Sequence, residues 1–133
     1  MAFCLLLPGL SLAQDVAHEP GWQSVAMQFL SAQLEERWAD AAIQLVEEER
    51  EPWLSKQEWL SKKAVAVRSA WPEDVRQREA DRVRRELERL AVSVLTCEKT
   101  PELGEGMHRV RIDPDGRSYR FLRMRHDAQG WGV

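Results

Sequence analysis

Apolar residues recur every three to four positions through the first half of the chain. Between residues 25 and 46 the stripe includes Leu30, Trp38 and Leu45, and charged residues fill the positions between them. This spacing is the helical period. The stripe is compatible with one long helix or with a break near Trp38. We place the end of this region at Pro52, because a proline disfavours helix at the residue before it.

Two further helices are predicted before residue 91. Ser55 and Glu58 form a capping box, a hydroxyl followed three residues later by a carboxylate, and this places a helix start at Ser55. Trp71-Pro72 closes that helix. Glu73 opens the next one, where negative charge complements the helix dipole. The alternating acids and bases that follow, as far as Arg89, are typical of a solvated helix face.

From residue 91 onward the pattern becomes that of strands. Residues 91–97 are rich in β-branched side chains, and residues 107–112 alternate polar with apolar positions. The turn Asp113-Pro-Asp-Gly116 predicts a hairpin into a strand over 117–125, and a last short strand follows at 131–133. Helices followed by an antiparallel meander predict an α+β fold, with the N-terminal helices packed on a curled, cone-like sheet.

The first 13 residues are mostly apolar and carry no charge. They end in Ser11-Leu12-Ala13, which has small residues at positions -3 and -1 of a signal-peptidase cleavage site. We therefore interpret residues 1–13 as a signal peptide. A buried N-terminal strand or helix is the alternative. The segment is shorter than the roughly 20 residues that span a bilayer, and no lipid-bearing cysteine follows it, so no stable membrane anchor is expected. Residues 14–22 then form a flexible lead-in, and residues 23–133 form one domain.

Composition and charge narrow the chemistry further. The 133 residues are 44% hydrophobic and 31% charged with a net charge of -3, which is ordinary for a globular protein and does not favour nucleic acid as a partner. After cleavage Cys97 is the one remaining cysteine, and its apolar neighbours predict a small buried hydrophobe. Neither metal-ligand spacing nor a phosphate loop or nucleophile motif occurs, so we predict no metal, cofactor or catalytic residue.

Candidate binding residues lie on the predicted hairpin and at one tryptophan. Arg109 and Arg111 share a face of the hairpin and make it basic, and their neighbour across the turn is Arg120 or Arg123, depending on the register. They form either a solvated surface that resists strand pairing or a face that binds an acidic partner. Tyr119 lies among them in the predicted strand. Trp53 falls in the predicted interhelical loop, where it either lines a pocket mouth or partner surface or packs on the core.

The C-terminal segments carry a resemblance to a known superfamily. Val110-Arg-Ile-Asp-Pro-Asp-Gly116, Tyr119-Arg-Phe-Leu-Arg-Met124 and Asp127-Ala-Gln-Gly-Trp131-Gly-Val133 resemble the closing meander of the nuclear transport factor 2-like (cystatin-like) superfamily. Residues 26–45 are similar to its first two helices. The resemblance covers most of residues 23–133 and points to its small exported bacterial members. It implies a cone-shaped pocket, which the long charged helix before the sheet would leave shallow or open.

These features favour an exported, non-enzymatic binding or assembly module of the bacterial envelope, periplasmic or secreted, that uses a cone pocket or a sheet face. Its partner would be another envelope protein or a second copy of the chain, and a small ligand is also possible. The alternative is an isomerase- or dehydratase-type enzyme with an acid–base pair inside the cone. For that role the resemblance points by position to Tyr119 and Asp40.

The signal-peptide interpretation makes a direct prediction. The mature protein is expected to begin at Gln14, because cleavage follows Ala13. N-terminal mass spectrometry of periplasmic and culture-medium fractions measures this. A protein found in the cytosol with Met1 still attached would contradict it.

Overall fold

The helices come first along the chain and the sheet comes last. The computed structural model describes residues 21–133, so the predicted signal peptide and nearly all of the lead-in lie outside the described residues. Within this range the helices are α2 (Trp22–Leu34), α3 (Trp38–Ile43), α4 (Glu47–Ser69) and α5 (Glu73–Ala91). The strands are β1 (Val94–Lys99), β2 (Met107–Asp113), β3 (Arg120–Asp127) and β4 (Gly130–Gly132), with a short 3-10 turn (Pro101–Leu103) after β1.

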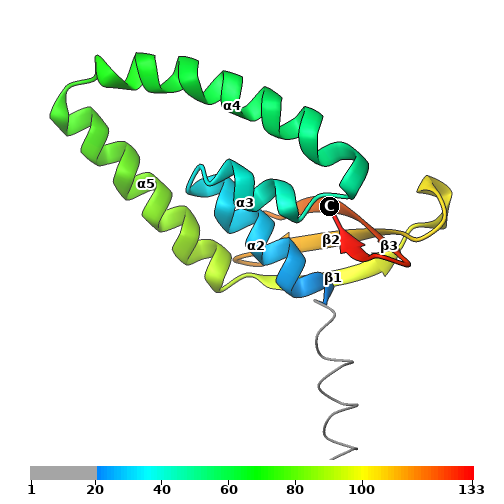
Figure 1. Ribbon diagram of the computed structural model, residues 1–133. Coiled ribbons are helices and arrows are strands. Elements are labelled where there is room, and N and C mark those ends of the chain that lie inside the picture. The colour runs from blue at the N-terminus through cyan, green and yellow to red at the C-terminus, as the bar shows by residue number, and fades with distance from the viewer. Residues whose placement is uncertain (1–20) are drawn as a thin grey trace, which may run out of the picture.

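The four strands form an open antiparallel meander in the order β1-β2-β3-β4, and the sheet does not close into a barrel (Figure 1). The predicted α+β class is therefore confirmed. Strand positions in the sequence were predicted to within a few residues. The starts of β1 and β3 shift most, by three residues each, because β1 begins at Val94 rather than at residue 91 and β3 at Arg120 rather than at residue 117.

One face of the sheet packs on α2, and we call it the inner face. Val110 and Ile112 of β2 and Met124 of β3 are buried there against Phe29 and Leu30 of α2. The remaining buried members of this core are Val25, Ala26, Ala32, Ala41, Leu45 and Leu90. The other face, which we call the outer face, carries the alternate side chains of the same strands.

The predicted alternation along β2 is confirmed. Val110 and Ile112 are buried, whereas Arg109 is exposed and Arg111 is half-buried. The register places Arg109 opposite Arg123 and Val110 opposite Leu122 of β3. β2 therefore directs Val110 and Ile112 to α2 and its arginines to the outer face.

The predicted turn between β2 and β3 is also present. The carboxylate of Asp113 accepts hydrogen bonds from the backbone N–H groups of Asp115 and Gly116, the latter at 2.6 Å. Gly116 has a φ of 77°, which glycine adopts without steric cost. Asp115 in turn accepts from the N–H groups of Arg117 and Ser118, and these bonds lower the pKa of its carboxyl group.

The prediction for the middle of the chain was wrong. Pro52 does not end a helix, and Ser55 does not begin one, because both lie inside α4. Pro52 is less than two turns from the helix start and costs one hydrogen bond, from its missing N–H to the carbonyl of Glu48. Both residues are exposed, so water can bond to that carbonyl instead.

A residue in each outer strand of the sheet packs against the core. Trp131 of β4 lies between the imidazole rings of His108 and His126, at centroid distances of 4.6 and 4.5 Å, and packs against the core. Cys97 of β1 is half-buried against the same core. Burial, with a smaller contribution from Glu98, raises the pKa of its thiol, as expected for a cysteine that serves as an apolar side chain.

A pair of tryptophan variants tests this packing. Trp131→Ala should lower the free energy of unfolding by about 2–3 kcal/mol, since it removes a large side chain that packs on the core. Trp59→Ala is the matched control, because Trp59 is 57% exposed, and its cost should be below about 0.5 kcal/mol. Urea unfolding followed by circular dichroism measures both. Equal losses in the two variants would show that β4 does not pack on the core.

Candidate functional site

The helices α4 and α5 meet at a turn far from the sheet, and together they form what we call the helical arm (Figure 1). The 23-residue helix α4 has no buried residue. Instead it exposes several large apolar side chains, namely Trp59, Leu60, Val65 and Val67. The base of α4 is anchored by Trp53, whose ring lies 5.8 Å from that of Phe29 and 6.1 Å from that of Trp38.

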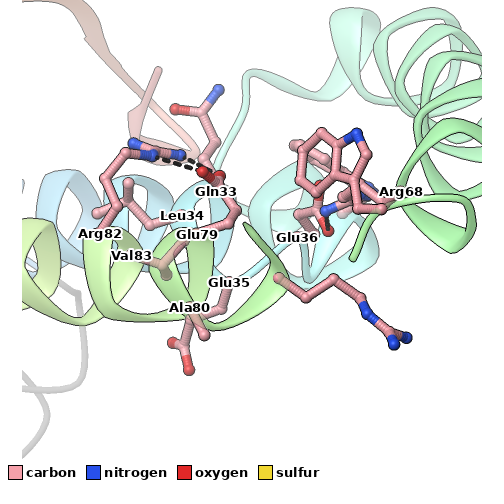
Figure 2. A pocket seen from close by; sticks show the side chains of 12 residues that line it. Gln33, Leu34, Glu35, Glu36, Arg68, Glu79, Ala80, Arg82 and Val83 are labelled. Atoms are coloured by element: carbon pink, nitrogen blue, oxygen red, sulfur yellow. Dashed lines mark hydrogen bonds and ion pairs between the residues drawn. The ribbon is translucent and has the colours of Figure 1, made fainter. Parts of the chain in front are cut away.

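A cavity of about 540 Å³ lies between the arm and the corner that joins α2 to α3 (Figure 2). Its apolar lining includes Leu34, Trp38, Trp71 and Val83. Across it, Arg68 of α4 forms an ion pair of 2.8 Å with Glu36 in the corner. The hydrogen bond to Glu36 raises the pKa of the Arg68 guanidinium, against the opposing effect of burial.

Glu36 reaches the arm from an unusual backbone conformation. Its φ of 57° lies in the left-handed region, which non-glycine residues seldom adopt. The chain turns here between α2 and α3, and the carboxylate of Glu36 points to Arg68. The corner is therefore both the end of α2 and the point at which the outer part of the arm is held.

The other charges around this cavity neutralise one another. Glu79 accepts two hydrogen bonds from Arg82, at 3.0 and 2.6 Å, and they lower the pKa of its carboxyl group. Arg76 pairs with Glu73 at 3.0 Å. Two enclosed donors, Nε1 of Trp38 and Nη2 of Arg68, have no hydrogen-bond partner. The charged groups named around the cavity are thus paired with one another and the rest of its lining is mostly apolar, which does not favour proton-transfer chemistry.

The outer face of the sheet gathers three of the five predicted binding residues. The guanidinium of Arg111 lies 3.9 Å from the ring centroid of Tyr119, and that of Arg109 lies 4.5 Å from Phe121. The two rings meet edge to face at 5.4 Å. The strand alternation placed Phe121 on the same face as Tyr119, but Phe121 was not named as a binding residue.

The arginines of this face also have acidic partners within the chain. Arg109 pairs with Glu98 of β1, and Arg111 pairs with Asp113 at 3.3 Å. The ion pairs and the rings together hold both guanidinium groups across the sheet surface. Tyr119 and Phe121 each remain 50% exposed. The result is an aromatic and basic surface with no other element of the described chain packed on it.

The two other predicted binding residues lie elsewhere. Arg120 has the inner-face register, opposite Ile112, and lines a small cavity of about 200 Å³ at the end of the sheet. It therefore does not join Arg109 and Arg111, because one step along a strand reverses the face. Trp53 is not in a loop. It lies half-buried in α4 and packs against the core. Packing on the core was one of the two roles expected for it.

The two side chains suggested for catalysis do not meet. Asp40 is exposed on α3 and pairs with Arg37 at 2.8 Å, while Tyr119 belongs to the outer face. In residues 21–133 the one buried polar residue is Thr100. No cluster of three potential metal ligands is found in that range, and no helix in it is long and apolar enough to cross a membrane.

Comparisons of the chain with protein-family models, with curated proteins and with solved structures find no match. Function is therefore inferred from the cavity beside the helical arm and from the outer face of the sheet.

Proposed function

We propose that this protein is an exported, non-enzymatic binding module that assembles with a protein partner through the outer face of its sheet. The observation that carries the proposal is the half-exposed pair Tyr119 and Phe121, stacked with Arg111 and Arg109 on an uncovered sheet face. Tyrosine and arginine are among the residues that contribute most to protein–protein binding. Membership of the nuclear transport factor 2-like superfamily, like export, stays a prediction.

The stacked arrangement reduces the cost of binding. Each arginine is already oriented by a carboxylate and a ring, so little side-chain freedom is lost when a partner covers it. A third arginine on this face, Arg123, has no ion pair within residues 21–133 and lies directly opposite Arg109. Like charges in this position are unfavourable unless an acid offsets them, which favours an acidic partner surface.

The inner face supports the binding proposal over the enzymatic alternative. Side chains of α2 fill the space that a cone pocket would occupy, and they meet Val110, Ile112 and Met124. An isomerase or dehydratase would need an acid–base pair on that face. The side chains buried there are apolar, so the outer face is the better candidate for function.

Analytical ultracentrifugation and crosslinking on whole envelopes test the proposal. A Tyr119→Ser/Phe121→Ser double variant should weaken association, with itself or with a partner, by about tenfold or more. Arg109→Ser/Arg111→Ser should weaken it less and should reduce its dependence on salt, because part of the charge of both arginines is balanced within the chain.

Arg84→Ser supplies a matched control, since Arg84 is an exposed arginine that pairs with Asp81 on α5 and does not belong to the sheet. It should leave association and its salt dependence unchanged. Association that is equally strong in the aromatic double variant and in the Arg84 control would rule out the outer face as the binding surface.

A further inference from the structure

One edge of the sheet is left unpaired along most of its length. β4 pairs with β3 only at Arg125, His126 and Asp127. Backbone groups on a strand point alternately to its two neighbours. The N–H of His126 donates to the carbonyl of Gly106, on the β2 side, at 2.9 Å. The backbone groups of Phe121 and Arg123 therefore point away from β2, and no strand of the described chain lies there to pair with them.

A groove runs beside this free edge. It is a cavity of about 490 Å³ with β3 residues 121–125 along one side. Phe29, Leu45 and Trp53 provide apolar lining, and Glu49 lies at the side formed by α4. The groove thus combines unpaired backbone donors and acceptors with an apolar wall.

Val133, the residue after β4, makes its backbone hydrogen bonds on the side away from β3. The N–H of Val133 donates to the carbonyl of Gln44 at 2.9 Å, and the N–H of Val46 donates to the carbonyl of Val133 at 3.2 Å. Gly132 allows this approach, because a Cβ atom there would lie only 2.9 Å from Cγ1 of Val46. Val133 is therefore bonded to the segment before α4 rather than to β3.

We propose that this edge binds an extended peptide segment of a partner protein by strand addition. The segment lies antiparallel to β3, in line with β4, and bonds to the backbone of Phe121 and Arg123. Five residues of β3, from 120 to 124, are free of β4, so a segment of about five residues fits.

The two faces of the sheet define the side chains that the segment must carry. Residues bonded to Phe121 and Arg123 place their side chains on the outer face, because directly paired residues share a face. Arg123 is exposed there without an ion pair in the described range, so an acidic residue is favoured. The intervening residues point into the groove against Phe29, Leu45 and Trp53, so they are apolar. The recognised pattern is an alternation of acidic and apolar residues.

This inference goes beyond the proposed function, since strand addition uses backbone groups and the groove rather than the stacked outer face. The two proposals can fail separately. The Tyr119→Ser/Phe121→Ser variant removes side chains of the outer face and keeps the N–H and carbonyl groups of the edge.

The probe is the peptide acetyl-Val-Glu-Val-Glu-Val-amide, added to the ¹⁵N-labelled full chain and followed by NMR. Amide signals of β3 and the groove should shift in a saturable way. Methylation of the two glutamate nitrogens should abolish binding, because these N–H groups donate to β3. Methylation of the same number of valine nitrogens should leave binding within about twofold, since those N–H groups point away from the edge.

Two charge variants complete the experiment. Arg123→Glu should weaken binding of the Val/Glu peptide by roughly five- to tenfold and favour the matching Val/Lys peptide. Arg117→Glu is the control, because Arg117 is also an exposed arginine without an ion pair in residues 21–133 but does not line the groove. It should bind like the unmodified protein.

Three results would overturn the proposal. They are the absence of saturable shifts at millimolar peptide, equal loss of binding from both methylation patterns, and shifts centred on another surface. Equal binding of the Val/Glu and Val/Lys peptides would overturn the preference for acidic segments.

Discussion

The packing of α2 on the inner face of the sheet is the contact on which the rest of the structure depends. A sheet of four short strands cannot bury an apolar face by itself. Here Phe29 and Leu30 lie with Val110, Ile112 and Met124 in the one core that joins the helices to the strands. Once α2 occupies this face, the opposite face and one edge of the sheet have no further helix in the described chain to cover them. The surfaces that we connect with function are a direct consequence.

The helical arm is held in place differently from α2, because its middle contributes no residue to that core. It is held near its base by Trp53, which contacts Phe29 and Trp38, and farther out by the ion pair between Arg68 and Glu36. Between these points α4 depends on its own hydrogen bonds and charge distribution. Acidic residues fill its first turn and Arg68 lies in its last, an arrangement that complements the helix dipole. Few tertiary contacts imply that the arm opens more readily than α2 or the sheet.

The sequence predicted the parts of the fold that depend on local chemistry. The alternation in β2 and the Asp113-to-Gly116 turn are local signals, and both appear where they were expected. Pro52 and the Ser55 capping box led to a wrong prediction of a helix boundary between them. Their local preferences are outweighed because the helix has already begun at Glu47 and continues through both residues. The placement of Arg109 and Arg111 on one face followed from the alternation of β2, whereas the contact of Arg111 with Tyr119 did not follow from it. The choice between Arg120 and Arg123 as the neighbour of Arg109 stayed open because it depends on the register, and the register selects Arg123. The free edge of β3 could not be predicted, since it depends on how few residues of β3 pair with β4.

The central claim is that the sheet is covered on one face and open at the β3 edge, and amide hydrogen exchange measured by NMR tests it residue by residue. The backbone N–H groups of Leu122 and Met124 are directed to β2 and should be strongly protected, as should those in the middle of α2. The N–H groups of Phe121 and Arg123 should exchange close to the rate of an unstructured chain. Such two-residue alternation along β3 would be the signature of an open edge. Protection of Phe121 and Arg123 equal to that of Leu122 and Met124 would show that another part of the protein or a second copy covers the edge, and would contradict the account.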